Sequence, residues 1–162
     1  MGPGALQTED KGGTVLKDKF FAGALAGMIG AAVMVSLNFL VNLIPGVDLK
    51  LLFGVSELFV PKPLYGTLEG AIIGLIAHLV CGSMVGLGIM LVLEKTGYNH
   101  LILKGTFLGL LAWFLLCGLL GRVLGLRMQD KFIDNILMIL IHIPFGIATA
   151  WAVYLFRKKA KV

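Results

Sequence analysis

Four long apolar stretches limit what this chain can fold into more than any other feature. They cover residues 20–44, 68–93, 101–120 and 133–156. A helix rises about 1.5 Å per residue, so roughly 20 apolar residues cross a hydrocarbon layer about 30 Å thick. Charged residues make up only 14% of the 162-residue chain, against about 25% in soluble domains. The sequence therefore predicts an all-α integral membrane protein, a four-helix bundle whose first partner is the lipid bilayer.

The segments outside these stretches predict how the chain is organised and oriented. A polar tail, residues 1–19, precedes a single four-span domain, residues 20–156, and a basic tail, residues 157–162, follows it. No small-residue cleavage site follows the first stretch, so we expect it to be retained as a span. Nine of the 14 Lys and Arg residues fall on the side of the two tails and five on the other. Because positively charged loops stay inside, both termini are expected in the cytoplasm, and the net charge of +5 requires no nucleic-acid partner.

Glycines recur every four residues within the spans. Residues four apart lie on one helix face, and small residues there allow two helix backbones to approach closely. The glycines expected to serve helix packing are Gly23, Gly27, Gly74, Gly82, Gly86, Gly105, Gly109 and Gly146. Where such a seam stays exposed to lipid, it predicts self-association into a homo-oligomer or binding of a membrane-protein partner.

The same phrases occur twice along the chain. A lysine leads into Gly-x-x-x-Gly at the start of the first and third spans. The second and fourth spans carry His78-x-x-x-Gly82 and His142-x-x-x-Gly146. Because each copy would hold two spans, both would enter the membrane from the same side. The pattern predicts a parallel two-by-two helix repeat.

His78 and His142 are the candidate site residues. Each lies about ten residues into its span, near the expected membrane midplane, so the two imidazoles can meet if their helices face each other. Such a pair can ligate haem iron, hold a metal or share a proton. The alternative is that each neutral ring ties helices together by a hydrogen bond to a carbonyl or to a hydroxyl such as that of Ser83, Thr106 or Thr149.

Two asparagines and two cysteines also lie within the spans. Asn38 and Asn42 form a polar membrane face near the end of the first span, which serves either helix packing or a polar pathway. Cys81 and Cys117 lie in the second and third spans. A thiol in apolar surroundings keeps its proton and reacts slowly, so we interpret both cysteines as small packing residues.

The connection between the first two spans predicts a short helix of its own. Asp48 is the expected cap of a helix within residues 49–60, which is too short to span and is expected to lie in the membrane interface. It is interpreted either as a connector or as a lid over the mouth of the bundle. In the corresponding loop of the second half, Asp130 and Asp134 are expected in the first turn of the fourth span, where they complement the helix dipole.

Familiar enzyme signatures are missing from the sequence, which contains no H-E-x-x-H, G-x-S-x-G or Walker loop. The sequence therefore favours a non-enzymatic scaffold or a partner- or lipid-binding protein that self-associates, although an enzyme built on other residues stays open. The second hypothesis is a bundle that binds haem or a metal through His78 and His142. The third is a small-solute transporter or channel.

In the order of these glycine and histidine phrases, from residue 20 to residue 156, the chain resembles uncharacterised small prokaryotic four-span membrane proteins, including the YqhR-type proteins of Firmicutes. The phrases are Gly-x-x-x-Gly in the first and third spans, His78-x-x-x-Gly82 and His142-x-x-x-Gly146. The resemblance implies a four-span fold in the bacterial cell membrane. It implies no activity and no site.

Overall fold

The computed structural model describes residues 18–126 and 131–160, and within these ranges every regular element is helical. Three spans are formed by α2 (Lys19–Val41), α4 (Leu68–Thr96) and α7 (Phe132–Lys159). The remaining span, Leu101–Val123, is continuous but changes its winding along its length. It consists of α5 (Leu101–Trp113), the π-helix η2 (Phe114–Leu120) and α6 (Gly121–Val123). Two short helices, α3 (Leu51–Ser56) and the 3-10 turn η1 (Lys62–Leu64), lie between α2 and α4.

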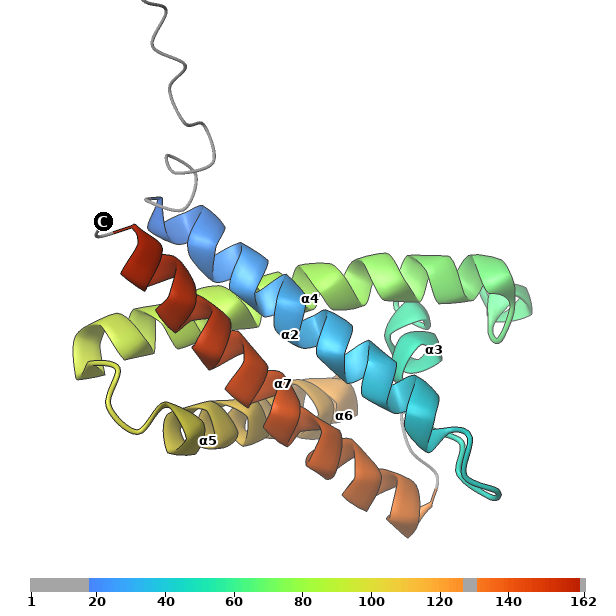
Figure 1. Ribbon diagram of the computed structural model, residues 1–162. Helices are drawn as coiled ribbons and strands as arrows, with labels where there is room; N and C mark the ends of the chain where they lie inside the picture. The colour runs from blue at the N-terminus through green and yellow to red at the C-terminus, as the bar shows by residue number, and fades with distance from the viewer. Residues whose placement is uncertain (1–17, 127–130, 161–162) are drawn as a thin grey trace, which may run out of the picture.

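The long helices form two crossed layers. In Figure 1, α2 and α7 run side by side in the foreground, and α4 and the third span cross behind them. The helix α2 packs against α4 and α7, and α5 packs against α7. The first residues of α2, the end of α7 and the connection from α4 to α5 lie at one end of the molecule, and α3 lies towards the other. Both described chain ends are therefore on the same side.

Polar groups mark where the helices begin and end. The carboxylate of Asp18 accepts a hydrogen bond from the main-chain N–H of Phe20 at 2.7 Å, which caps α2. The hydroxyl of Thr67 accepts from the N–H of Gly70 at 3.3 Å and caps α4. Gly97 ends α4 with a φ of 79°, a conformation that glycine adopts without steric penalty. Lys104 then donates to the Gly97 carbonyl at 2.8 Å, and so ties the start of α5 to the end of α4.

Two helix crossings bring backbones together with no room for a side chain. At the α2–α4 crossing, a Cβ atom on Gly27 would lie 2.0 Å from the carbonyl oxygen of Gly82. At the α5–α7 crossing, a Cβ atom on Gly146 would lie 2.1 Å from the carbonyl oxygen of Gly105. Gly23 and Gly86 also lie at the first crossing, and Gly109 lies at the second. All these glycines therefore face another helix of the same chain.

The connection between α2 and α4 folds back onto the bundle. A Cβ atom on Gly74 of α4 would lie 2.1 Å from the carbonyl oxygen of Leu52, so α3 rests directly on the α4 backbone. Leu49 and Leu51 are each only 2% exposed. The Asn42 side chain fastens this connection, because its amide donates to the Leu49 carbonyl at 3.1 Å and accepts from the Leu49 N–H at 2.7 Å. A buried segment held in this way is part of the core.

Ion pairs join three helices at the end that carries both described termini. The carboxylate of Glu94 on α4 pairs with Lys19 on α2. It also lies 2.8 Å from Nε of Arg157 on α7. These groups are partly exposed, so each pair contributes only a fraction of a kcal/mol, about 0–1. Their effect on register is greater, because one carboxylate aligns three helix ends.

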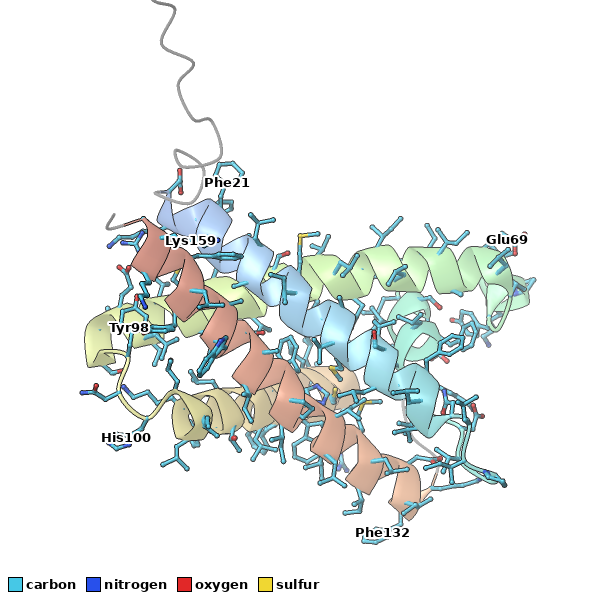
Figure 2. The ribbon with its side chains drawn as sticks, in the orientation of Figure 1. Phe21, Glu69, Tyr98, His100, Phe132 and Lys159 are labelled. Carbon is cyan, nitrogen blue, oxygen red and sulfur yellow. The ribbon has the colours of Figure 1, made fainter. Side chains whose placement is uncertain are left out.

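The lipid-facing surface agrees with the predicted class. All four long helices are long and apolar enough to cross a membrane. Large apolar side chains point outward along them, as Figure 2 shows, with Leu68 74% and Leu103 71% exposed. Exposed apolar surface on this scale is unfavourable in water and favourable in lipid. The chain is thus a multi-pass membrane protein whose helices contact the bilayer.

The structure corrects several sequence expectations. The first helix ends at Val41, three residues before the expected boundary, and the second, third and fourth spans each run three residues further than expected. Asp48 does not cap the short helix, because α3 begins after Lys50 without a side-chain cap. Asp48 lies instead 3.9 Å from the Lys50 ammonium. Asp134 does lie in the first turn of α7. Asp130, the polar residues 1–17 and the last two residues fall outside the described residues.

Candidate ligand cavity

The bundle contains a cavity of about 110 Å³ between α4, the third span and α7, next to α3. Every long helix contributes to its wall. Two histidines and two cysteines line it, namely His78, His142, Cys81 and Cys117. The other lining residues are Met34, Leu51, Val55, Leu58, Gly82, Val85, Ala112, Leu116, Leu120, Leu124, Leu126 and Phe145. The cavity is therefore apolar except for four side chains that can form polar or coordinate bonds.

His78 brings an unused nitrogen to this wall. The side chain belongs to α4, one helical turn before Gly82, and the residue is only 8% exposed. Its Nε2 atom has no hydrogen-bond partner among residues 18–126 and 131–160. The ring lies beside the main chain of Ala31 on α2. Because Ala31 lies inside a helix, where its N–H is already used, its carbonyl is the group that can accept from the ring.

His142 is held in the same manner by its own helix. Its Nδ1 lies 2.7 Å from the carbonyl oxygen of Met138, and the residue is only 5% exposed. A carbonyl only accepts hydrogen bonds, so in the neutral ring Nδ1 carries the hydrogen and Nε2 is left with its lone pair. The two rings are close enough to interact electrostatically. The structure thus brings His78 and His142 to one cavity, where Nε2 of His142 can accept a hydrogen bond and Nε2 of His78 has no partner among the described residues.

The hydroxyl partners expected for the histidines are occupied elsewhere. Ser83 donates to the carbonyl of Leu79 at 3.0 Å. Thr149 donates to the carbonyl of Phe145 at 2.8 Å. Both bonds stay within one helix, and the bond from His142 to Met138 does so as well. The expectation that hydroxyls on neighbouring helices hold the rings is therefore wrong for Ser83 and Thr149.

The cysteines belong to the same site, which the sequence interpretation missed. Cys81 lies three residues after His78, so both point from the same face of α4. Cys117, in η2, is near enough to Cys81 for the two thiols to interact electrostatically. Both cysteines are half-buried. The three-residue spacing between His78 and Cys81 was the available signal, and we had interpreted Cys81 as packing alone.

The asparagines expected to form one polar face do different things. Asn42 holds the connection to α3 through Leu49, as described above. Asn38 is buried, and its Oδ1 has no partner in the described part of the chain. Neither asparagine lines the cavity. The structure therefore does not bring Asn38 and Asn42 together with the histidines.

The size of the cavity limits what it holds. An enclosed apolar cavity of about 150 Å³ accommodates benzene in a well-studied engineered protein. The cavity described here, at about 110 Å³, is of that order. A haem macrocycle is several times larger than benzene, so it does not fit between the histidines in this conformation. The described residues also contain no group of three or more His, Cys, Asp or Glu side chains placed to hold a metal ion.

The walls of the cavity differ in how firmly they are packed. On the α2 and α7 side, Met34 is 1% and Phe145 is 4% exposed. On the third-span side the wall is the π-helix η2, in which no residue is fully buried. A π-helical segment widens the helix locally and often occurs at functional sites. The cavity therefore has a rigid wall and a loosely packed one.

Comparison of the chain with protein-family models, curated proteins and solved structures finds no match.

Proposed function

We propose that this multi-pass membrane protein binds a small, mainly apolar molecule in the cavity at His78 and His142. The observation that carries the proposal is the unpartnered Nε2 of His78, buried in a wall that is otherwise almost entirely apolar. A buried polar atom without a partner destabilises a fold by about 1–3 kcal/mol. A ligand that donates a hydrogen bond to this nitrogen removes the penalty.

The position of the site supports a ligand from the membrane. His142 uses Nδ1 on the Met138 carbonyl, and with the hydrogen of His78 on Nδ1 as well, the two Nε2 atoms present acceptors only. The complementary ligand carries a hydroxyl or another donor and an apolar body. Molecules of this kind concentrate in the bilayer, which surrounds the bundle. The proposed role is that of a binding protein, with no chemical step assigned to it.

The sequence favoured self-association through glycine seams exposed to lipid, and the structure does not leave these seams exposed. Gly23, Gly27, Gly82 and Gly86 lie against each other, and Gly105, Gly109 and Gly146 do the same. These seams are occupied within one chain and are not exposed to lipid. A transporter also gains little support, because Asn42 is engaged with Leu49 instead of lining a pathway.

The proposal includes an internal repeat and an orientation. The two glycine crossings, α2 with α4 and α5 with α7, pair the spans in chain order and carry the matching phrases at their contact points. His78 and His142 occupy corresponding places one turn before Gly82 and Gly146. This correspondence supports a parallel two-by-two repeat. By the excess of Lys and Arg, the end with both chain termini faces the cytoplasm of a bacterial cell.

Phenol tests the proposal, because it combines a benzene-sized ring with one hydroxyl donor. The protein is reconstituted in phosphatidylcholine nanodiscs, and alkylation of Cys81 and Cys117 by N-ethylmaleimide is followed by mass spectrometry. We expect phenol to protect both thiols saturably. Ala112→Phe fills the cavity and should abolish the protection, whereas Val123→Phe, at a residue 82% exposed, should retain it. No saturable protection in the unmodified protein would overturn the proposal.

A further inference from the structure

The cavity continues into a second hollow on the surface that faces lipid. A crevice of about 250 Å³ runs between α4 and α5 towards the end that carries both chain termini. It shares Val85, Ala112 and Leu116 with the histidine cavity. The two hollows therefore lie next to each other along the helix pair, with these three side chains between them.

The crevice opens to the bilayer. Leu111 and Leu115, which line it, are 37% and 45% exposed. Gly88 also lines it, and a Cβ atom built on this glycine would have no neighbour within 4 Å. The contrast with Gly27 and Gly82 shows that this side of α4 is not closed by another helix. Lipid chains in the bilayer are consequently the molecules that can reach it.

We infer that the occupant of the site is a single-chain lipid with a hydroxyl head group, which reaches the cavity sideways from the bilayer between α4 and the third span. Its hydroxyl donates to Nε2 of His78 in the cavity, and its chain lies in the crevice beside Gly88. This inference rests on the proposed function and adds the class of ligand and its route.

The two ends of the site explain why this class fits. The head-group end offers acceptor nitrogens and no described cation, so a hydroxyl is preferred to a carboxylate or a phosphate. The crevice is lined by Ile, Leu, Val, Ala and Gly residues, which suits an alkyl or prenyl chain. The chain moves from bilayer lipid into a crevice that is equally apolar, so its burial adds little affinity, and the hydroxyl, which gains an acceptor, provides the selectivity.

Hexadecanol is the probe for this inference, with thiol protection in nanodiscs as the readout. We expect hexadecanol to protect Cys81 and Cys117 and methyl hexadecyl ether, which lacks the donor, to protect them about tenfold less well, since a hydrogen bond of about 1.4 kcal/mol corresponds to that factor. Gly88→Phe fills the crevice and should weaken hexadecanol about tenfold or more, because the phenyl ring occupies the space that the chain needs and would have to be displaced from it. Phenol, which occupies only the cavity, should be affected less than about twofold.

The matched control is Gly118→Phe. Gly118 also has open space around its Cβ position, with only Phe114 at 3.9 Å, but it lines neither hollow. Hexadecanol binding should survive this substitution. If Gly88→Phe leaves hexadecanol unchanged while phenol still binds, the crevice and the lipid class are wrong and the cavity stands. If neither phenol nor hexadecanol protects the thiols, the proposed function fails as well.

Discussion

The two sides of α4 are built in opposite ways. Towards α2 the helix presents Gly82 and Gly86, and the two backbones touch. Towards the third span it presents Val85 and Gly88, and the helices leave a crevice and a cavity between them. One helix thus holds the bundle together on one side and leaves space for a ligand on the other. The comparison shows that a glycine is informative only together with the partner it faces.

The largest expected effect on stability comes from placing a larger side chain at the α2–α4 crossing, where the two backbones touch. Gly27→Leu would place Cβ at 2.0 Å from the Gly82 carbonyl oxygen, where backbone and not a flexible side chain must move. We expect a loss of about 3 kcal/mol or more in the free energy of unfolding, or no folded protein. Helical circular dichroism during thermal and denaturant titration in detergent measures this.

Gly88→Leu is the control on the open side of α4, where no atom lies within 4 Å of the built Cβ. Replacing a helical glycine there should leave the unfolding free energy unchanged or raise it by up to about 1 kcal/mol. If Gly27→Leu and Gly88→Leu were equally stable, the α2–α4 crossing would not be more tightly packed than the side of α4 that carries Gly88.

The second prediction concerns the segment beside the cavity. Asn42→Ala removes both hydrogen bonds to Leu49, whose N–H and carbonyl are left without these partners in a residue 2% exposed. We expect a loss of about 2 kcal/mol. Alkylation of the cavity thiols should also become faster, since Leu51 and Val55 that follow Leu49 line the cavity. Thermal unfolding and the rate of N-ethylmaleimide labelling measure the two effects.

Asn42→Asp provides the matched comparison for this substitution. A carboxylate still accepts from the Leu49 N–H but cannot donate to its carbonyl. Unchanged stability and an unchanged labelling rate in both variants would mean that Asn42 does not hold α3 against the cavity.

The contrast between the two sides of α4 also explains what the sequence could predict. The four helices follow from apolar length, which is a local property, and their boundaries come within three residues of those observed. The glycine spacing predicts that backbones approach each other, but not which backbone is the partner. The partner depends on how the helices cross. Gly27 and Gly88 are both helical glycines, yet Gly27 faces the backbone of another helix and Gly88 faces open space.

Only part of the candidate site could be predicted from the sequence. The matching registers of His78 and His142 indicate that the rings can meet, because depth in the membrane follows from counting residues along each span. The sequence did not predict the burial of α3, the winding of η2 or the convergence of the cysteines. Each depends on tertiary contacts, such as Gly74 on Leu52, that no local pattern encodes.

The last prediction concerns His78, where the two interpretations of the histidine predict different changes in stability. If Nε2 awaits a ligand, His78→Leu removes a buried unsatisfied acceptor and loses the contact with Ala31, so the unfolding free energy should change by less than about 1 kcal/mol. The preference of the cavity for phenol over toluene should then fall about tenfold, because toluene has the same shape without a donor. If His78 instead ties helices together, the substitution should destabilise the bundle and leave the phenol preference unchanged. Thermal unfolding and thiol protection on the same nanodisc sample separate these outcomes, and only the first is consistent with the open side of α4 as a binding site.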